Sequence, residues 1–410
     1  MIYVIDNNVE FVGGAKNTCI YNLNSGKLYS IDSLFRSQIE QLLNAQGQGI
    51  NEDLSTVKEL LIKEKILVDL NNLSPKRAVT DSHLNAISFA WIEITQNCNL
   101  RCLHCYEESS AERKSSQMNF SDFKIAIQRL KEYQIRNIQL IGGEPLSHPE
   151  ILQIIDYCSN KFDYIEIFTN GTLINDILLE KIKQSKIRLA FSIYAENARL
   201  HDSVTQVAGS FDKSYRNLQK AIALGIECRV ASVEMINVPQ FSFSSIGVEH
   251  RNDLPRITGK ANLQLFNRDM VRRKLITKKT FSTPIDANSI YQNMNSHNCF
   301  RSKLYIDVDL NVFPCVMERR FLHGNIRNNE LADEIDPSII RFNKDMIDGC
   351  QYCEFRYACF DCRPDANGNS RNAKPWFCTY NPQLGVWYNE DDFIDELLFQ
   401  YERGEKNGTI

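Results

Sequence analysis

Hydrophobic and polar positions divide the chain into three stretches with different periodicities. From residue 1 to about 69, short strand-like runs (IYVI, TCIYNL, KLYSI) are separated by Asn-Asn, Gly-Gly and Asn-Ser-Gly turn signals. Two stretches with helical spacing of apolar residues follow, over 34–43 and 54–66. Strands followed by helices in so short a segment predict a small α+β module over 1–70. The polar, proline-containing stretch after it predicts a linker over 71–87.

The second stretch, from residue 88 to about 240, alternates strand and helix patterns. Strands are predicted over 88–94, 137–141, 164–168, 187–193 and 227–236. Helices are predicted between them over 121–133, 149–159, 175–184 and 211–224. This alternation predicts an α/β fold with a parallel sheet, either open or closed into a complete or partial barrel. In both arrangements ligands gather at the carboxyl ends of the strands, so the motifs described below are expected on one rim.

The third stretch, from about residue 241 onward, has weak periodicity and is dominated by loops. Seven of the 13 cysteines lie between Cys299 and Cys378, a region too rich in loops to be held by an ordinary apolar core. We therefore expect a bound metal or cluster to stabilise it. The segments predicted here are a bridging region, a cysteine-rich domain, and a final helix with a polar tail, over 241–296, 297–390 and 391–410.

Composition and charge exclude several classes of protein. With 410 residues, 43% of them hydrophobic, the chain has material for two to four domain cores and is not disordered or fibrous. A net charge of −4 gives no electrostatic signature of binding to duplex nucleic acid or to an anionic membrane. The N-terminus lacks the pattern of a signal peptide, and no stretch approaches the roughly 18 apolar residues of a membrane span. The odd cysteine count then favours metal or redox chemistry in the reducing cytoplasm over a disulfide framework.

A first cysteine cluster follows the first strand of the alternating region directly. In TQNCNLRCLHCYEE, Cys98, Cys102 and Cys105 have the spacing C-x3-C-x2-C. Three thiolates on one tight loop can hold three irons of a cubane cluster, which leaves the fourth iron open and reactive. Three unrelated thiols, or a zinc site completed by His104, are the alternatives.

This spacing, in the loop after the first strand, resembles the signature of the radical S-adenosylmethionine (radical SAM) superfamily. The resemblance implies a partial (β/α) barrel core, in which the open iron chelates the amino and carboxylate groups of S-adenosylmethionine (SAM). It also implies reductive cleavage of SAM to a 5′-deoxyadenosyl radical, which abstracts hydrogen from a substrate. His104 stands where the family usually has an aromatic residue, whose role is largely a backbone contact with adenine.

Three further motifs at strand ends resemble the SAM-binding stretches of the family. In GGEP, over 142–145, the glycines allow close backbone approach and Glu144 can accept from a cationic amine. FTNGT and FSIY, which end the third and fourth strands, resemble the ribose- and carboxylate-binding stretches. All three motifs are also typical of strand-end turns and polar caps. The cofactor contacts that the resemblance implies are His104, Gly142, Gly143, Glu144, Pro145, Asn170 and Ser192.

A second set of cysteines lies in the C-terminal region. The run CQYCEFRYACFDC contains two CxxC pairs within thirteen residues, so metal binding is expected, with zinc as the alternative to iron and sulfide. Beside the first cluster, these cysteines resemble the SPASM extension of radical SAM enzymes, which carries auxiliary 4Fe-4S clusters. The resemblance implies one cluster on Cys350, Cys353, Cys359 and Cys378. It implies a second cluster, with an open iron or a non-cysteine ligand such as His297, on Cys299, Cys315 and Cys362.

The N-terminal module gives an indication of the kind of substrate. It resembles the winged-helix peptide-recognition domain (RRE or PqqD type) of enzymes that mature ribosomally made peptides (RiPPs), and a strand edge beside a helix suits capture of a leader peptide by strand addition. A structural or dimerisation module is the alternative. Together the segments resemble a peptide maturase, an oxidoreductase that installs a thioether or carbon–carbon crosslink in a precursor peptide, with electrons from a donor such as flavodoxin or ferredoxin. The alternatives are a radical SAM enzyme acting on a small molecule or haem precursor, and a non-enzymatic iron–sulfur or zinc-stapled protein.

The sequence does not identify a catalytic base. Glu318 is the carboxylate nearest to Cys315, and Asp307 and Asp309 precede it, but surface carboxylates are the simpler interpretation of all three. Three cysteines remain outside the proposed clusters. They lie in apolar contexts and are expected to be small buried hydrophobic residues, and they are Cys19, Cys158 and Cys228.

Overall fold

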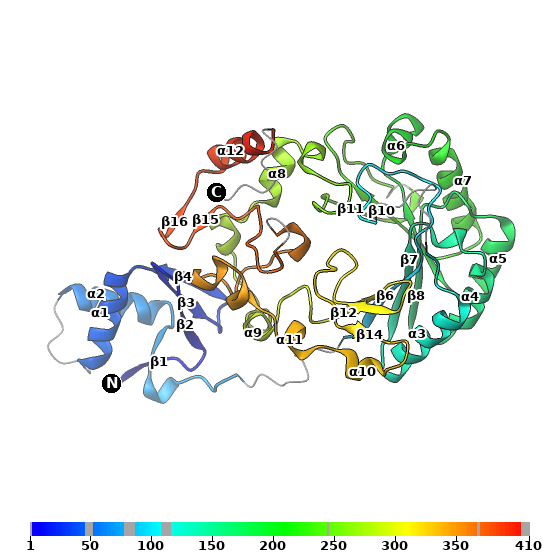
Figure 1. Cartoon of the computed structure of the whole chain (residues 1–410). Helices are drawn as coiled ribbons and strands as arrows, with labels where there is room; N and C mark the ends of the chain where they lie inside the picture. Colours follow the sequence, from blue (N-terminus) through cyan, green and yellow to red (C-terminus); the bar gives the residue numbers. More distant parts are fainter. Residues whose placement is uncertain are drawn as a thin grey trace.

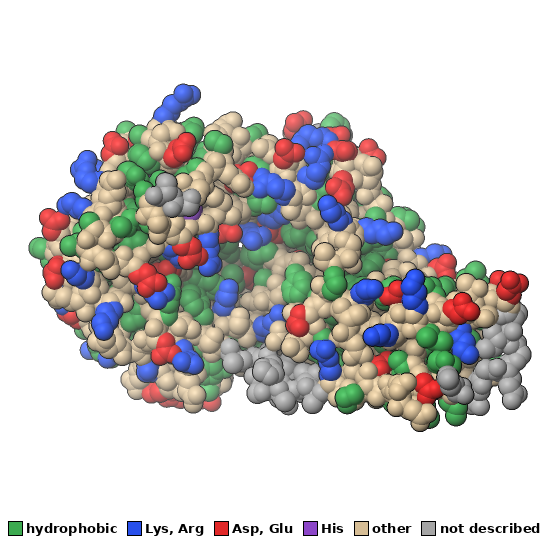
Figure 2. All heavy atoms as spheres, turned by 180° about the vertical axis from the view of Figure 1, so that it is seen from behind, with side chains coloured by type: hydrophobic (Ala, Val, Ile, Leu, Met, Phe, Trp, Pro, Cys, Tyr) green, Lys and Arg blue, Asp and Glu red, His purple; other side chains and the backbone are tan. Residues whose placement is uncertain are grey.

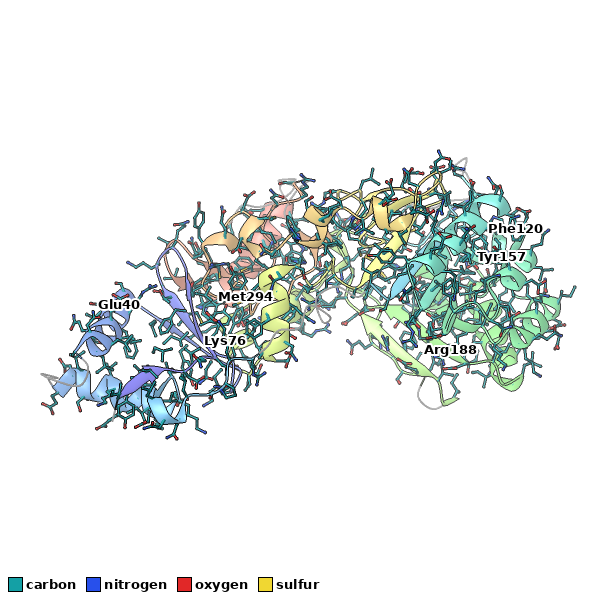
Figure 3. The ribbon with its side chains drawn as sticks, turned by 90° about the horizontal axis from the view of Figure 1, so that it is seen from below. Glu40, Lys76, Phe120, Tyr157, Arg188 and Met294 are labelled. Atoms are coloured by element: carbon teal, nitrogen blue, oxygen red, sulfur yellow. The ribbon has the colours of Figure 1, made fainter. Side chains whose placement is uncertain are left out.

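The computed structural model of the chain describes residues 2–45, 52–77, 87–107, 116–243, 246–366 and 370–402. The remainder of the predicted linker and of the C-terminal tail lies outside these residues. The molecule is elongated, with the N-terminal module at one end, a large sheet with its helices at the other, and the cysteine-rich region between them (Figure 1). The view from below shows the same order, with Glu40 at one end, Met294 in the middle and Arg188 toward the other end (Figure 3).

A nine-stranded sheet forms the large lobe, in the order β11-β10-β9-β8-β7-β6-β12-β13-β14. It is parallel from β11 to β12, and β13 and β14 are antiparallel additions. The strands are β6 (Phe89–Thr95), β7 (Asn137–Gly142), β8 (Tyr164–Thr169), β9 (Arg188–Ser192), β10 (Cys228–Val233), β11 (Glu249–Asp253), β12 (Lys303–Ile306), β13 (Asn311–Phe313) and β14 (Gly324–Asn325). The predicted α/β fold with a partial barrel is confirmed.

Helices cover the outer face of this sheet (Figure 1). They are α3 (Phe120–Glu132), α4 (Ile151–Cys158), α5 (Asp176–Gln184), α6 (Ala198–Thr205) and α7 (Ser210–Ala223). Asn119, Asn175 and Asn197 start three of them, and each side chain accepts a hydrogen bond from a backbone N–H of the first turn. Their apolar faces pack with the strands into the largest hydrophobic core of the molecule. The inner face of the sheet is left to meet the cysteine-rich region.

The sheet draws strands from beyond residue 240. All five predicted strands and all four predicted helices of the alternating region are present, with ends displaced by at most three residues. The sequence pattern did not predict α6, nor β11 from the bridging region, nor β12 from the cysteine-rich region. Since β12 pairs in parallel with β6, the cysteine-rich region is joined to the alternating strand–helix region through the main sheet.

The N-terminal module has strands and two helices, as predicted, with two further strands at 9–13 and 67–69. β1 (Tyr3–Ile5) pairs with β5 (Leu67–Asp69), and a separate three-stranded antiparallel sheet has the order β2-β3-β4. The remaining elements are β2 (Val9–Gly13), β3 (Thr18–Asn22), β4 (Lys27–Ile31), α1 (Ser33–Asn44) and α2 (Glu52–Lys63). The strands β2 and β5 were not predicted.

The bridging region and the cysteine-rich region consist of short elements joined by loops, and a longer helix follows them. They are α8 (Arg268–Lys274), α9 (Ala287–Asn295), α10 (Leu331–Glu334), α11 (Pro337–Ile340), β15 (Tyr380–Asn381), β16 (Val386–Trp387) and the final helix α12 (Glu390–Glu402). No helix in the described part of the chain combines the length and apolarity that crossing a membrane requires.

Candidate active site and auxiliary cysteine sites

The three-cysteine loop begins at the carboxyl end of β6, on the rim predicted to bind ligands. The amide of Leu100 donates to the sulfur of Cys98 (3.4 Å), and the amide of Cys105 donates to the carbonyl of Cys102 (3.3 Å). The thiols of Cys98, Cys102 and Cys105 lie close enough for their charges to interact. Burial raises the pKa of Cys98 to about 12, so iron binding must displace its proton.

The two glycines of GGEP make room for this loop. A Cβ atom at Gly142 would lie 2.0 Å from the carbonyl oxygen of Thr95, and one at Gly143 would lie 2.3 Å from that of Asn97. The amide of Gly143 donates to Thr95 O (2.9 Å) and the amide of Glu144 donates to Asn97 O (2.6 Å). The glycines were expected to let the backbone come close to a ligand. In this structure they let it come close to the start of the cysteine loop.

Glu144 is fully buried between two strand ends. Its carboxylate accepts hydrogen bonds from the amide of Leu146 (3.0 Å), the hydroxyl of Thr169 (2.6 Å) and the amide of Asn170 (2.7 Å). Burial raises the pKa of Glu144 to about 7, against these three donors. It therefore ties β7 to β8 at the rim, and its place next to the cysteine loop suits contact with a cationic amine there. Pro145 opens the short turn that follows.

The polar candidates from the next two strands reach the same rim. Asn170 donates to the side chain of Asn99 in the cysteine loop (2.9 Å) and also hydrogen-bonds with the thiol of Cys98. Ser192, at the end of β9, hydrogen-bonds with Tyr194, which in turn hydrogen-bonds with Cys102. Gly143, Glu144 and Asn170 thus contact the segment around the cysteine loop directly, and Ser192 reaches it through Tyr194.

His104 packs beside the same tyrosine. Its ring lies edge-on to Tyr194 with centroids 4.7 Å apart, and its Nδ1 is buried without a hydrogen-bond partner. Burial lowers the pKa of His104 to about 4, so the ring is neutral. This nitrogen lies on the same rim as the three thiols. A site that binds a polar cofactor is expected to contain such an unpartnered buried nitrogen when the cofactor is not bound. The residues present therefore fit a 4Fe-4S cluster with SAM.

A buried charged cluster that the sequence did not reveal lies below this rim. Glu93 on β6 and Tyr305 on β12 are completely buried, and Arg319 forms an ion pair with Glu107 and lies 3.9 Å from Glu93 Oε1. The guanidinium of Arg319 is 4.9 Å from the centre of the Tyr305 ring. Burial and the neighbouring Glu93 raise the pKa of Glu107 to about 8. The one sequence signal was the acidic residue inside the apolar strand FAWIEIT.

The surface is hollowed between the sheet lobe and the rest of the molecule. The view from behind shows a recess there, with hydrophobic side chains exposed inside it and Lys and Arg side chains around it (Figure 2). This recess separates the sheet lobe from the rest of the molecule. It gives a substrate room to approach the inner face of the sheet.

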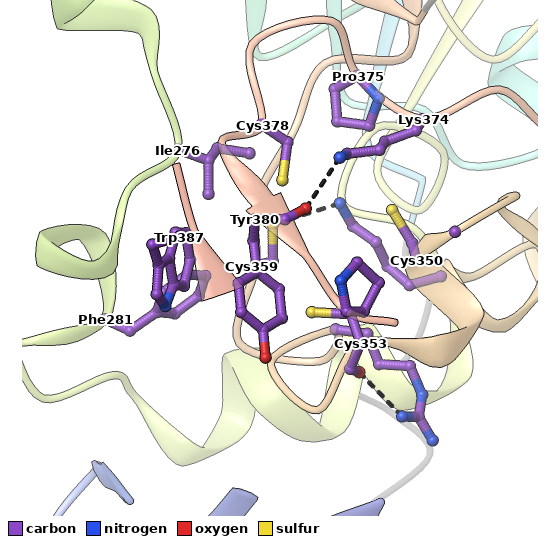
Figure 4. Close-up of a pocket in the computed structure, with 14 residues that line it drawn as sticks. Ile276, Phe281, Cys350, Cys353, Cys359, Lys374, Pro375, Cys378, Tyr380 and Trp387 are labelled. Atoms are coloured by element: carbon purple, nitrogen blue, oxygen red, sulfur yellow. Dashed lines mark hydrogen bonds between the residues drawn. The ribbon is translucent and has the colours of Figure 1, made fainter. Parts of the chain in front are cut away.

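Four of the C-terminal cysteines line one pocket. Its empty volume is about 420 Å³, and the cysteines around it are Cys350, Cys353, Cys359 and Cys378 (Figure 4). The segment of Cys378 is held by a parallel bridge to Ile276, and the amide of Cys353 donates to the carbonyl of Cys350 (2.9 Å). The structure therefore brings together the four cysteines predicted to share a cluster.

The other three cysteines also converge. The side chains of Cys299 and Cys362 hydrogen-bond with each other, and Cys315 lies close enough to Cys362 for their charges to interact. The suggested extra ligand His297 is not available here, which corrects that expectation. Its Nε2 lies 2.7 Å from Asp361 Oδ1 and its Nδ1 accepts from the amide of Cys299 (3.2 Å), so both ring nitrogens are already engaged.

The described thiols are not gathered around a single point. Among the residues that the structure describes, no three His, Cys, Asp or Glu side chains converge on a point where one metal ion could sit. Zinc, with bonds of about 2.3 Å to sulfur, needs its thiolates packed around one point, whereas each thiolate of a cubane binds a different iron.

The carboxylates considered as a catalytic base have structural partners. Glu318 is buried, and both of its carboxylate oxygens accept from the guanidinium of Arg320. Asp307 accepts from the amides of Asp309 (3.0 Å) and Asn311 (2.9 Å) in a turn. Asp309 itself is exposed. Both oxygens of Glu318 therefore have Arg320 as a partner, and its role as a base stays a prediction.

Comparison with known proteins agrees with this site. Residues 92–246 match the family described as the Radical SAM superfamily, so the chain contains a radical SAM domain, and SAM and a 4Fe-4S cluster are its cofactors. The chain is 32% identical over 176 residues to the antilisterial bacteriocin subtilosin biosynthesis protein AlbA of Bacillus subtilis (strain 168), a match covering 42% of this chain and 39% of AlbA. It is 27% identical over 170 residues to the AdoMet-dependent heme synthase of Methanosarcina barkeri, covering 41% of this chain and 44% of that protein. The chain thus spans less than half the length of these curated relatives.

Solved structures show the same fold over more of the chain. The crystal structure of Streptococcus suis SuiB bound to S-adenosylmethionine has a TM-score of 0.54 at 16% identity and covers 88% of this chain and 96% of SuiB. Native anSMEcpe with bound AdoMet has a TM-score of 0.52 at 14% identity and covers 78% of this chain and 99% of that one. At these identities the likeness is one of fold.

Proposed function

We propose that this protein is a radical SAM peptide maturase with two auxiliary 4Fe-4S clusters, which installs a thioether or carbon–carbon crosslink in a precursor peptide. The observation that carries the proposal is the docking of the N-terminal module on the loop of the four-cysteine pocket. Tyr21 donates to the carbonyl of Glu354 (2.8 Å), Ser30 donates to its carboxylate (2.9 Å), and the amide of Ala15 donates to Tyr352 O (2.8 Å). A module fixed to this region can present a tethered peptide to the recess beside it.

Different residues of the chain have different roles in the proposed reaction. Cys98, Cys102 and Cys105 hold the cluster that, with SAM, supplies a 5′-deoxyadenosyl radical. The strand-end residues Glu144 and Asn170 shape the SAM site. The seven C-terminal cysteines hold the auxiliary clusters, which give electrons a path to or from the substrate.

The module has open strand edges for a leader peptide. In the order β2-β3-β4, both β2 and β4 pair on one side only within this sheet. Strand addition uses such an edge for main-chain hydrogen bonds, and tethering raises the local concentration of the core peptide at the radical site. The relatives support a peptide substrate: one is named a subtilosin biosynthesis protein, another is the mycofactocin maturase MftC of Mycobacterium tuberculosis, and SuiB has been solved with the precursor peptide SuiA.

We place the protein in the cytoplasm with a small electron-transfer protein such as flavodoxin or ferredoxin as donor. All 13 cysteines are free thiols in the structure, which suits a reducing compartment where they are available to iron.

The test uses a labelled precursor peptide encoded beside the gene. Leu34, 67% exposed on α1 of the module, is replaced by Glu, and Ile177, 71% exposed on the outer helix α5, is replaced by Glu as the matched control. We expect L34E to weaken peptide binding by at least about tenfold and I177E to leave it unchanged. Equal affinities for L34E, I177E and the wild type would argue against docking on this face of the module.

A small-molecule substrate is the second candidate, because the relatives include haem synthases. It predicts peptide-independent turnover of a haem precursor. That result, with no binding of any neighbouring peptide, would replace the peptide proposal.

A further inference from the structure

A network of buried charges lies between the two auxiliary cysteine sites. Asp361 accepts from His297 and Lys344 at Oδ1 (2.7 and 2.5 Å) and from Arg363 at Oδ2 (3.0 Å). All four side chains are at least 97% buried. Charges this deep are unfavourable unless they are paired, so the network must be held by what surrounds it.

Its position links the two sites. Asp361 lies between Cys359, which lines the four-cysteine pocket, and Cys362, which belongs to the three-cysteine site. The sulfur of Cys299 is 3.7 Å from the carbonyl oxygen of Asp361. One residue therefore touches the three-cysteine site through its backbone and the four-cysteine site through Lys344.

Lys344 is the cation that reaches a cysteine sulfur. Its Nζ lies 3.6 Å from the sulfur of Cys359, within hydrogen-bond distance for sulfur. The charged residues lining the pocket are all basic, namely Lys344, Arg356 and Lys374. Lys374 instead donates to the carbonyl of Tyr380 (2.9 Å), and Arg356 donates to the carbonyl of Cys353 (3.0 Å) (Figure 4). Arg356 also donates to Asp345 (2.7 Å).

The three-cysteine site has a different electrostatic environment. Arg256 and Lys274 interact with Cys362, but both are ion-paired to Asp365 (3.1 and 2.9 Å). At the radical site, besides burial, the carboxylate of Glu144 and the thiol of Cys105 both act to raise the pKa of Cys98, in the direction opposite to that of a cation. Within the part of the chain that the structure describes, the four-cysteine pocket is where an ammonium group, that of Lys344, is seen to hydrogen-bond a cysteine sulfur.

We propose that Lys344 is a positioning residue that raises the reduction potential of the auxiliary cluster at the Cys350 site, and that Asp361 limits the effect by sharing the ammonium charge. A cationic hydrogen bond to a ligand sulfur stabilises the reduced, more negative form of a cluster, and it does so more strongly in a buried, low-dielectric site. The proposal rests on the proposed function only for the presence of this cluster and is independent of the substrate.

The experiment measures the potential directly. The full chain carrying Cys98→Ala, Cys102→Ala and Cys105→Ala is reconstituted anaerobically with iron and sulfide and titrated potentiometrically with EPR detection. The signal that disappears when Cys353→Ala is added is assigned to the Cys350 site. Because the radical site is absent, the measurement is unaffected if the peptide proposal fails.

Four variants separate the roles. We expect Lys344→Met to lower the potential of this signal and Lys344→Arg to keep it close to wild type. Lys374→Met, which removes a charge lining the same pocket but no hydrogen bond to sulfur, should shift it less. Asp361→Asn should raise it, because the ammonium group is then no longer shared. Iron and sulfide counts accompany each variant.

A Lys344→Met protein with full iron content and an unchanged potential would overturn the proposal, as would a Lys374→Met shift of equal size. If the Lys344→Met protein does not bind the cluster, the potential measured for Asp361→Asn tests the proposal by itself. A raised potential supports the proposal, and an unchanged or lowered one contradicts it.

Discussion

The radical core and the cysteine-rich region are held together by different forces. The core buries a continuous apolar interior between its parallel strands and covering helices. The cysteine-rich region has short elements and buries charged side chains such as Lys344, Asp361 and Arg363 next to its cysteines. The core is therefore stabilised by one continuous apolar interior, whereas the cysteine-rich region combines smaller apolar clusters with buried charges beside its cysteines, and we expect ligation of these cysteines to add to its stability.

Removal of iron should have the largest effect and should separate the two regions. We expect a chelator under anaerobic conditions to expose residues 344–366, around the cysteine loops, to hydrogen exchange, while strands β6 to β9 and β12 stay protected in the main sheet, because metal binding contributes to the folding free energy where ligands hold loops together. Peptide-resolved exchange with mass spectrometry measures this. Uniform loss of protection across both regions would show that they do not differ in their dependence on iron.

Loss of the three radical-site thiols should remove activity without unfolding the core. We expect Cys98→Ala, Cys102→Ala and Cys105→Ala together to abolish 5′-deoxyadenosine formation and to change the free energy of unfolding by about 1 kcal/mol or less, because these side chains lie on a loop at the sheet rim. The matched control, Cys353→Ala with Cys359→Ala, should instead destabilise the cysteine-rich region. Release of 5′-deoxyadenosine by the first variant would exclude this loop as the radical site.

The same difference explains what the sequence could predict. The strands from β6 to β10 are apolar runs with helices between them, so their pattern gave their positions to within a few residues. β11, with the sequence EHRND, is a polar edge strand and β12 has only four residues, so neither has a readable period. The cysteine spacings identified both C-terminal groups. Glu93 and Lys344 could not be identified from the sequence, because their roles depend on distant partners. Arg319, near Glu93, is more than 200 residues away along the chain, and Cys359, beside Lys344, is 15 residues away.

Acid should destabilise the core through one buried histidine. His201 is completely buried, its Nδ1 accepts from the amide of Tyr194 (3.1 Å), and burial lowers its pKa to about 4. The unfolded chain binds this proton near pH 6.5, so the stabilisation is complete above that pH and is lost as the pH falls toward 4. We expect roughly 2 kcal/mol to be lost over this window.

Denaturant unfolding at several pH values checks the expectation. His201→Gln keeps an acceptor for Tyr194 but does not titrate, so its stability should fall less between pH 6.5 and 4. Parallel pH profiles for variant and wild type would show that His201 is not the group responsible.

The contact between the N-terminal module and the cysteine-rich region should be the weakest of these effects. Tyr21→Phe removes the hydrogen bond to Glu354 O and should destabilise the interface by about 1 kcal/mol. Tyr29→Phe is the matched control, because its hydroxyl bonds to Glu64 inside the module. Limited proteolysis of the module should become faster for Tyr21→Phe if the interface opens. Equal cleavage rates of the module in Tyr21→Phe and wild type would show that this bond does not hold the interface.

The most direct test of the proposed function is anaerobic turnover of the full chain with the precursor peptide encoded beside its gene, SAM and a reductant. We predict 5′-deoxyadenosine together with a peptide lighter by a pair of hydrogen atoms, and neither product from the variant lacking Cys98, Cys102 and Cys105. Formation of 5′-deoxyadenosine by the cluster-replete enzyme while the peptide mass stays unchanged would contradict the account.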